Sequence, residues 1–75
     1  MNQKREIELL MFDVLPYISN INYIKEIFEE AESLEDLERK VEELLKVEKD
    51  ITKKTDLKIL LEKIKEAKEK YSKST

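Results

Sequence analysis

Apolar side chains recur at steps of three and four residues along nearly the whole chain, which is the spacing of one face of an α-helix. In the first segment this stripe consists of Ile7, Leu10, Met11, Val14 and Leu15. Leu9 and Phe12 lie off that stripe, so the segment is apolar on more than one face. Pro16 disfavours helical geometry at Leu15 and has no backbone N–H to donate. The pattern therefore predicts a first helix over residues 4–15.

A second stripe predicts a helix over residues 21–32. It follows Ser19 and Asn20, which are both favourable N-cap residues. The stripe consists of Ile21, Ile24, Ile27, Phe28 and Ala31.

A third helix is predicted over residues 34–50, because Ser33 and Asp36 approximate a capping box at its start. Its stripe consists of Leu34, Leu37, Val41, Leu44, Leu45 and Ile51. Glu48 interrupts this series, so we expect the stripe to weaken toward the end of the helix.

The last helix is predicted over residues 56–71, with Thr55 or Asp56 as its N-cap. Its stripe consists of Leu57, Leu60, Leu61, Ile64, Ala67 and Tyr71. Residues 72–75 are expected to fray.

Four helices with short connections predict an all-α fold, a small antiparallel helical bundle of four or three helices. The third and fourth helices are expected to form a helical hairpin. The length of 75 residues suits a single helical domain over residues 1–75. In a chain this small the gain from apolar burial nearly cancels the entropy of ordering, so dimer formation is also expected as a source of stability.

The chain contains no cysteine, histidine or glycine, and each of these absences removes a class of chemistry. Without cysteine there are no disulfides or thiolate metal sites, which fits a cytoplasmic location. Without histidine the commonest metal ligand and general base are missing. Without glycine there is no phosphate-cradling loop. We therefore expect no enzymatic activity, cofactor, metal or small-molecule substrate. The high lysine and glutamate content is typical of proteins from heat-loving organisms.

Residues 14–24 contain no charged side chain, although 44% of the chain is charged; they read VLPYISNINYI. One interpretation places the aliphatic side chains in the core and treats Ser19, Asn20 and Asn22 as turn residues. The other places the aromatic side chains at the surface, because tyrosine suits interfaces and charge is depleted at interface cores. Both interpretations can hold together.

These observations favour a protein–protein interaction or oligomerisation module that binds through this uncharged corner. The candidate interface residues are Phe12, Tyr17, Ile18 and Tyr23. A protein partner or a second copy is the expected partner, and no long apolar segment indicates a membrane.

The alternative is a small DNA-binding regulator or chromatin-associated protein that uses a lysine cluster around the last interhelical turn. The cluster consists of Lys46, Lys49, Lys53, Lys54 and Lys58. Residues 46–75 carry 6 acidic and 10 basic side chains, whereas residues 1–45 carry 12 acidic and 5 basic ones. Against nucleic-acid binding, the net charge is −3 and arginine, the usual reader of guanine, occurs only at positions 5 and 39.

Overall fold

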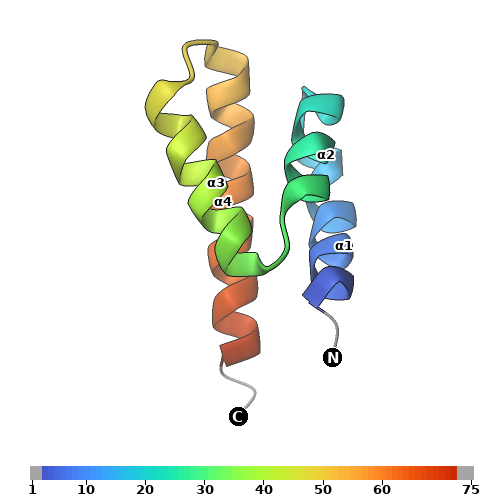
Figure 1. The fold of residues 1–75 in the computed structure, drawn as a ribbon. Helices are drawn as coiled ribbons and strands as arrows, with labels where there is room; N and C mark the ends of the chain where they lie inside the picture. The colour runs from blue at the N-terminus through green and yellow to red at the C-terminus, as the bar shows by residue number, and fades with distance from the viewer. Residues whose placement is uncertain (1–2, 73–75) are drawn as a thin grey trace.

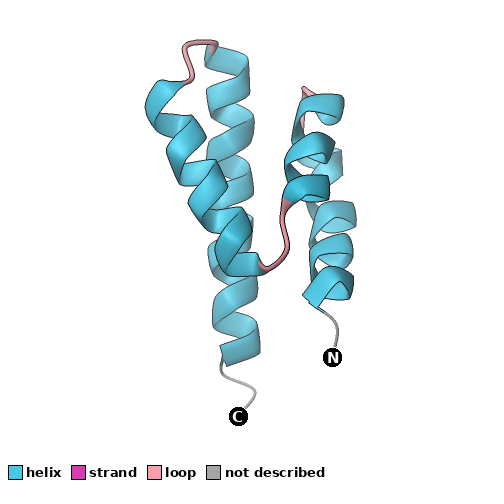
Figure 2. Ribbon diagram, in the orientation of Figure 1, coloured by secondary structure: helices cyan, strands magenta, loops and turns pink. Residues whose placement is uncertain are grey.

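Four α-helices follow one another in the computed structural model, which describes the backbone of residues 3–72 and the side chains of residues 5–70. They are α1 (Gln3–Val14), α2 (Ile21–Glu30), α3 (Leu34–Val47) and α4 (Ile51–Ser72), and a 3-10 helix, η1 (Leu15–Tyr17), follows α1. Residues 3–72 contain no strand (Figure 2). The predicted all-α helical bundle is confirmed. Residues 72–75 were predicted to fray, but Ser72 is still part of α4. Residues 73–75, and the predicted place of the Tyr71 side chain in the last stripe, lie outside what the structure describes.

The helices form two antiparallel pairs (Figure 1). Helices α1 and α2 run in opposite directions beside each other, and α3 and α4 make the predicted helical hairpin. The connection after α2 crosses from the first pair to the second. Helix α4 has 22 residues, or roughly 33 Å of helix, and accounts for most of the 39 Å length of the molecule.

One hydrophobic core is shared by all four α-helices. Except for Ile18, its buried side chains come from the predicted stripes, because residues three and four apart lie on the same side of a helix. Ile21 was predicted in the second stripe but is 47% exposed. The buried members are Ile7, Leu10, Val14, Ile18, Ile24, Ile27, Phe28, Ala31, Leu34, Leu37, Val41, Leu57, Leu60 and Ile64.

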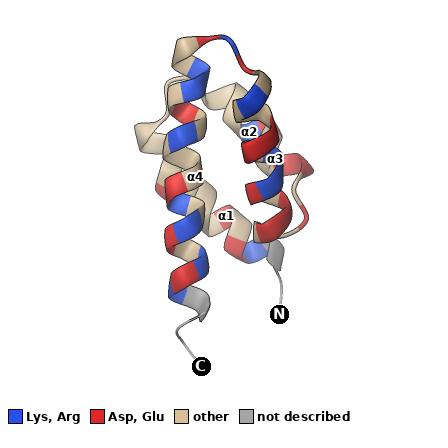
Figure 3. Cartoon of the chain, turned by 90° about the vertical axis from the view of Figure 1, so that its left-hand side faces the viewer, with Lys and Arg blue, Asp and Glu red and all other residues tan. Residues whose placement is uncertain are grey.

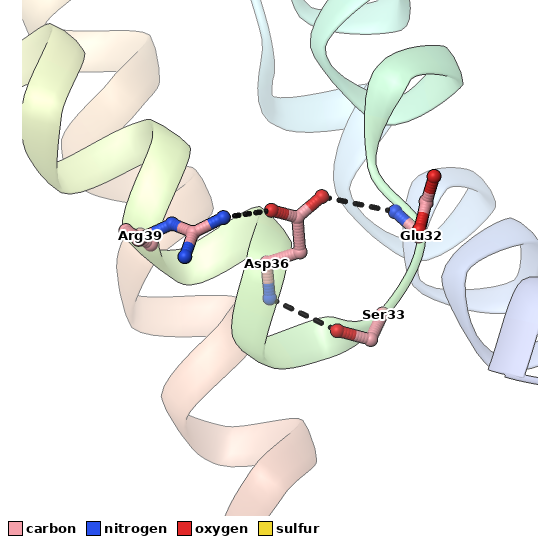
Figure 4. A network of polar contacts seen from close by, with 4 residues as sticks. All are labelled: Glu32, Ser33, Asp36 and Arg39. Carbon is pink, nitrogen blue, oxygen red and sulfur yellow. Dashed lines mark hydrogen bonds and ion pairs between the residues drawn. The ribbon is translucent and has the colours of Figure 1, made fainter.

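The corner between α2 and α3 confirms the predicted cap (Figure 4). The Ser33 Oγ accepts a hydrogen bond from the Asp36 backbone N–H at 3.0 Å. Asp36 accepts in turn from the Glu32 N–H at 3.1 Å and from Arg39 Nη2 at 2.6 Å. The hydrogen bond from Glu32 is the main reason why the pKa of Asp36 lies below its ordinary value.

The turn between α3 and α4 differs from the prediction. Helix α3 ends at Val47, and α4 begins at Ile51 instead of residue 56. The cap is Asp50, whose Oδ1 accepts from the Thr52 N–H at 2.9 Å and from the Thr52 hydroxyl at 2.7 Å. Thr55, one of the two predicted caps, donates its hydroxyl to the Ile51 carbonyl inside the helix. The predicted start at residue 56 left the polar residues 52–55 in the turn, but they form the first turn of α4, with Thr52 and Thr55 exposed and Lys53 and Lys54 half-buried.

Two side chains near this turn also depart from their predicted places. Ile51 was assigned to the third apolar stripe, yet it is 77% exposed and lies outside the core. Asp56 was predicted to cap α4, yet it lies within that helix and is only 1% exposed.

Asp56 connects α4 to the start of α2. Its carboxylate accepts from the Ser19 N–H at 3.1 Å, the Asn20 N–H at 2.7 Å and Asn20 Nδ2 at 2.9 Å. These backbone donors come just before α2, where no helical carbonyl is available to them. A buried carboxylate is stable only when such donors replace its lost water. Among the residues whose side chains are described, Asp56 is the buried acid, and these three hydrogen bonds supply the donors.

We predict that Asp56→Asn lowers the free energy of unfolding by about 1–3 kcal/mol, because the asparagine amide would point a donor at other donors. Urea unfolding followed by circular dichroism measures this loss. The matched control is Glu62→Gln, which neutralises an exposed acid on the same helix and should change stability little. Equal stability of Asp56→Asn and the parent chain would contradict the assigned role.

Candidate interaction surface

The uncharged segment of residues 14–24 is a corner between two helices, and its side chains divide between core and surface. Val14 and Ile24 are fully buried. Pro16 stands in η1, where α1 ends as predicted. The backbone at Ile18 is extended and turns the chain toward α2.

Ile18 is only 8% exposed, so it belongs to the core and not to a surface. The prediction that Ile18 belongs to the interface is therefore wrong. The physical reason is that the hydrogen bonds from Ser19 and Asn20 to Asp56 hold this part of the corner against α4.

Tyr23 is half-buried and has partners within the molecule. Its hydroxyl donates to Glu48 Oε1 at 3.1 Å, and Lys53 Nζ lies 4.9 Å from the centre of its ring. Burial, followed by the contact with Glu48, raises the pKa of the Tyr23 hydroxyl. Tyr23 therefore connects α2 to the turn between α3 and α4.

Phe12 and Tyr17 are the candidate residues that remain at the surface, with exposed fractions of 67% and 62%. Leu9, one helical turn before Phe12, is 55% exposed. Tyr17 is held by Lys63 of α4, whose Nζ lies 5.0 Å from the centre of the ring. We call Leu9, Phe12 and Tyr17 the aromatic patch.

Leu9, one member of the aromatic patch, borders a cleft of about 340 Å³ between α1 and α4. Leu9 and Lys63 line this cleft, so the lysine that contacts Tyr17 also lies beside Leu9. The cleft is further lined by Leu10, Asp13, Glu66, Ala67 and Lys70. Sequence reasoning did not include Leu9 in the candidate interface, although its position off the apolar stripe was the available signal.

The lysine cluster of the alternative function surrounds the turn between α3 and α4. Lys46, Lys49 and Lys58 are exposed, whereas Lys53 and Lys54 are half-buried. Glu48 and Asp50 lie within the same turn, and basic and acidic residues alternate along α4 (Figure 3). The structure thus gathers these lysines at one end of the molecule but intersperses them with carboxylates.

A second group of exposed apolar side chains lies near the same turn. Val47 is 69% exposed and Ile51 is 77% exposed. Both are aliphatic and stand among charged neighbours in the sequence.

Within residues 3–72 no helix combines the length and the apolar character that crossing a membrane requires. The described part of the chain also contains no group of three or more Asp, Glu, His or Cys side chains that could hold a metal ion.

Comparison with known proteins places the chain in a family. The MJ1579 family model matches residues 4–69. This chain belongs to the MJ1579 family. A relative from the thermophilic archaeon Methanocaldococcus jannaschii, MJ1579, is 70% identical over 70 residues, which cover 93% of this chain and all of the relative. No solved structure matches the chain. The family name states no activity, so the function has to be inferred from the molecular surface.

Glu48 gives the turn beside Tyr23 a dependence on pH. Its pKa lies below the ordinary value of 4.5, chiefly because the Asp50 N–H donates to its carboxylate and further because the Tyr23 hydroxyl does. The folded state therefore binds a proton less readily than the unfolded chain, and Glu48 contributes stability above pH 4.5 that is lost as pH falls through its folded pKa.

We predict that Glu48→Gln reduces the loss of stability between neutral pH and about pH 3 relative to the parent chain. Thermal unfolding at both pH values, followed by circular dichroism, gives the comparison. The control is Glu43→Gln, an exposed acid on α3. If Glu48→Gln and the parent chain lose the same stability on acidification, the carboxylate does not support the turn.

Proposed function

We propose that this chain is a non-enzymatic helical module that binds another protein, or a second copy of itself, through the aromatic patch. The observation that carries the proposal is the exposure of Leu9, Phe12 and Tyr17 on neighbouring parts of α1 and η1. Single exposed apolar side chains are ordinary, but an adjacent group that includes two aromatic rings is typical of an interaction site.

The placement of the aromatic patch on regular backbone supports this function. Leu9 and Phe12 project from α1, whose opposite side is fastened in the core by Ile7, Leu10 and Val14. The 3-10 backbone of η1 and the contact of the Tyr17 ring with Lys63 restrict the orientation of the Tyr17 side chain. Rigid anchors lose little conformational entropy on binding, which makes each buried ring more effective.

The alternative surface at the α3–α4 turn has less support as a binding site. Lys53 lies over Tyr23, and Glu48 and Asp50 place negative charge between the lysines. Binding of the phosphates of a nucleic acid requires a positive surface. A surface on which lysines and carboxylates are mixed is therefore less suited to bind nucleic acid.

A photo-crosslinking amino acid introduced at position 12 tests the proposal in cells that produce the protein. We predict defined covalent adducts from position 12, and far fewer from the same amino acid at position 51, because Ile51 is equally apolar and exposed but lies outside the patch. Mass spectrometry identifies the adducts, including those between two copies of the chain.

The double change Leu9→Glu and Tyr17→Glu should abolish the adducts from position 12 while leaving the helical circular dichroism spectrum unchanged. Both side chains are more than half exposed, so the substitutions leave the core intact. Equal adduct yields at positions 12 and 51, or none at position 12, would refute the aromatic patch as a binding surface.

A further inference from the structure

A groove lies between α2 and α3, which run side by side in opposite directions (Figure 1). Its volume is about 410 Å³, and both helices line it. Ile27 of α2 and Leu44 and Val47 of α3 supply its apolar lining. Val47 is 69% exposed, so part of this apolar lining is in contact with water.

The charges around this groove are predominantly negative. The carboxylates of the groove and of the adjoining α2–α3 corner belong to Glu26, Glu30, Glu32, Glu35, Asp36 and Glu43. The cations are Arg39 and Lys40. Glu26 is included because it lies one helical turn before Glu30, on the same side of α2. Lys25 lies outside the groove and lines a different one, between α1 and α2.

The two cations already have a carboxylate near them. Arg39 Nη2 donates to Asp36 Oδ1 at 2.6 Å. The hydrogen bond from the Glu32 N–H is the main reason why the pKa of Asp36 is lowered, and the charge of Lys40 contributes to the same shift. Glu30 and Glu43, by contrast, have no hydrogen bond or ion pair with any described side chain. The groove therefore keeps negative charge that the described residues do not neutralise.

The opposite end of the groove, near the α3–α4 turn, has balanced charges. Lys53 lies over the ring of Tyr23, whose hydroxyl donates to Glu48. Lys46 and Glu42 are both exposed and stand one turn apart on α3, where their charges offset each other. The groove thus combines an apolar lining with an excess of negative charge toward the α2–α3 corner.

We propose that this groove binds a basic amphipathic helix of another protein. Aliphatic side chains of that helix would cover Leu44 and Val47, and its lysines or arginines would face Glu30 and Glu43. An α-helix fits because it satisfies its own backbone hydrogen bonds, whereas an extended peptide would turn unpaired backbone groups toward an apolar lining. The inference goes beyond the proposed function, because this surface is separate from the aromatic patch.

A second copy of the chain is a poorer occupant for an acidic groove. Helix α1 exposes Leu9 and Phe12, but its described exposed charges are one base, Arg5, and two acids, Glu8 and Asp13. Along α4, basic and acidic residues alternate (Figure 3). Either helix would therefore bring carboxylates to the carboxylates of the groove, which favours a different and more basic partner.

A fluorescent synthetic peptide provides the probe. It has about 14 residues, the length of α3 or roughly 21 Å of helix, with leucines at steps of three and four and lysines beside them. The matched peptide carries glutamate in place of every lysine. Fluorescence anisotropy should show roughly tenfold tighter binding of the lysine peptide. Equal affinities for the two peptides would overturn the inference.

Charge reversal in the groove tests where the lysine peptide binds. The double change Glu30→Lys and Glu43→Lys should weaken binding by roughly tenfold, because it places like charges opposite the lysines. The matched control, Glu62→Lys and Glu66→Lys, alters the net charge equally at two exposed acids of α4 and should change the affinity by less than about twofold. Equal losses in the two double variants would overturn the assignment to the groove.

The apolar lining has its own matched pair of variants. Val47→Ser should weaken the lysine peptide by about fivefold, because it removes apolar surface from the groove. Ile51→Ser should leave the affinity unchanged, since Ile51 is also an exposed aliphatic residue but does not line the groove. Both substitutions replace exposed side chains, so the helical circular dichroism spectrum should stay the same. The same affinity for both variants would contradict the proposal.

Two further outcomes would assign the binding elsewhere. If Leu9→Glu with Tyr17→Glu weakens the lysine peptide, the peptide binds the aromatic patch and the groove is excluded. If sedimentation equilibrium shows that the parent chain self-associates and that Val47→Ser abolishes this association, a second copy occupies the groove and the inference is overturned. The crosslinking result at position 12 tests the aromatic patch independently of these outcomes.

Discussion

The buried carboxylate of Asp56 is the contact on which the arrangement of the two helix pairs depends. Asp56 lies on α4, yet its carboxylate accepts hydrogen bonds from the backbone N–H groups of Ser19 and Asn20, which precede α2 and lie some 36 positions earlier in the chain. A charge inside a small core is tolerated only with donors in defined directions. These hydrogen bonds hold Ser19 and Asn20 against α4, next to the buried Ile18, whereas Tyr17 stays exposed.

The two tyrosines of that corner show how one short segment serves two purposes. Each ring lies near a lysine of α4, with Lys53 beside Tyr23 and Lys63 beside Tyr17. Tyr23 adds a hydrogen bond to Glu48 and becomes part of the framework. Tyr17 remains largely exposed, which leaves its ring available to a partner. The same residue type thus contributes to stability at one position and supports the proposed binding at the other.

Some of the acidic residues in the first part of the sequence are paired within the molecule with basic residues of the last part. The acidic α3 lies against the more basic α4, and Lys68 Nζ donates to Glu38 Oε1 at 2.6 Å. This hydrogen bond, with the nearby carboxylates of Glu35 and Glu42, raises the pKa of Lys68. Opposite charge between the two helices therefore helps to align the hairpin, and the asymmetry does not by itself require a charged partner.

The sequence alone determined that there are four helices, the cap at Ser33, the end of α1 near Pro16 and most of the core, because all of these follow from spacing and capping within a few residues. It did not locate the start of α4, which lies at Ile51 instead of residue 56. It also predicted that residues 14–24 combine buried aliphatic and exposed aromatic side chains, which holds for Val14, Ile24 and Tyr17 but not for Ile21, which is 47% exposed, or for Tyr23, which is half-buried. Only the tertiary structure decided that Asp56 bonds to Ser19 and Asn20, that Tyr23 turns inward, and that Leu9 joins the aromatic patch. These outcomes depend on contacts between residues far apart in the chain, and helical periodicity carries no information about which helices become neighbours.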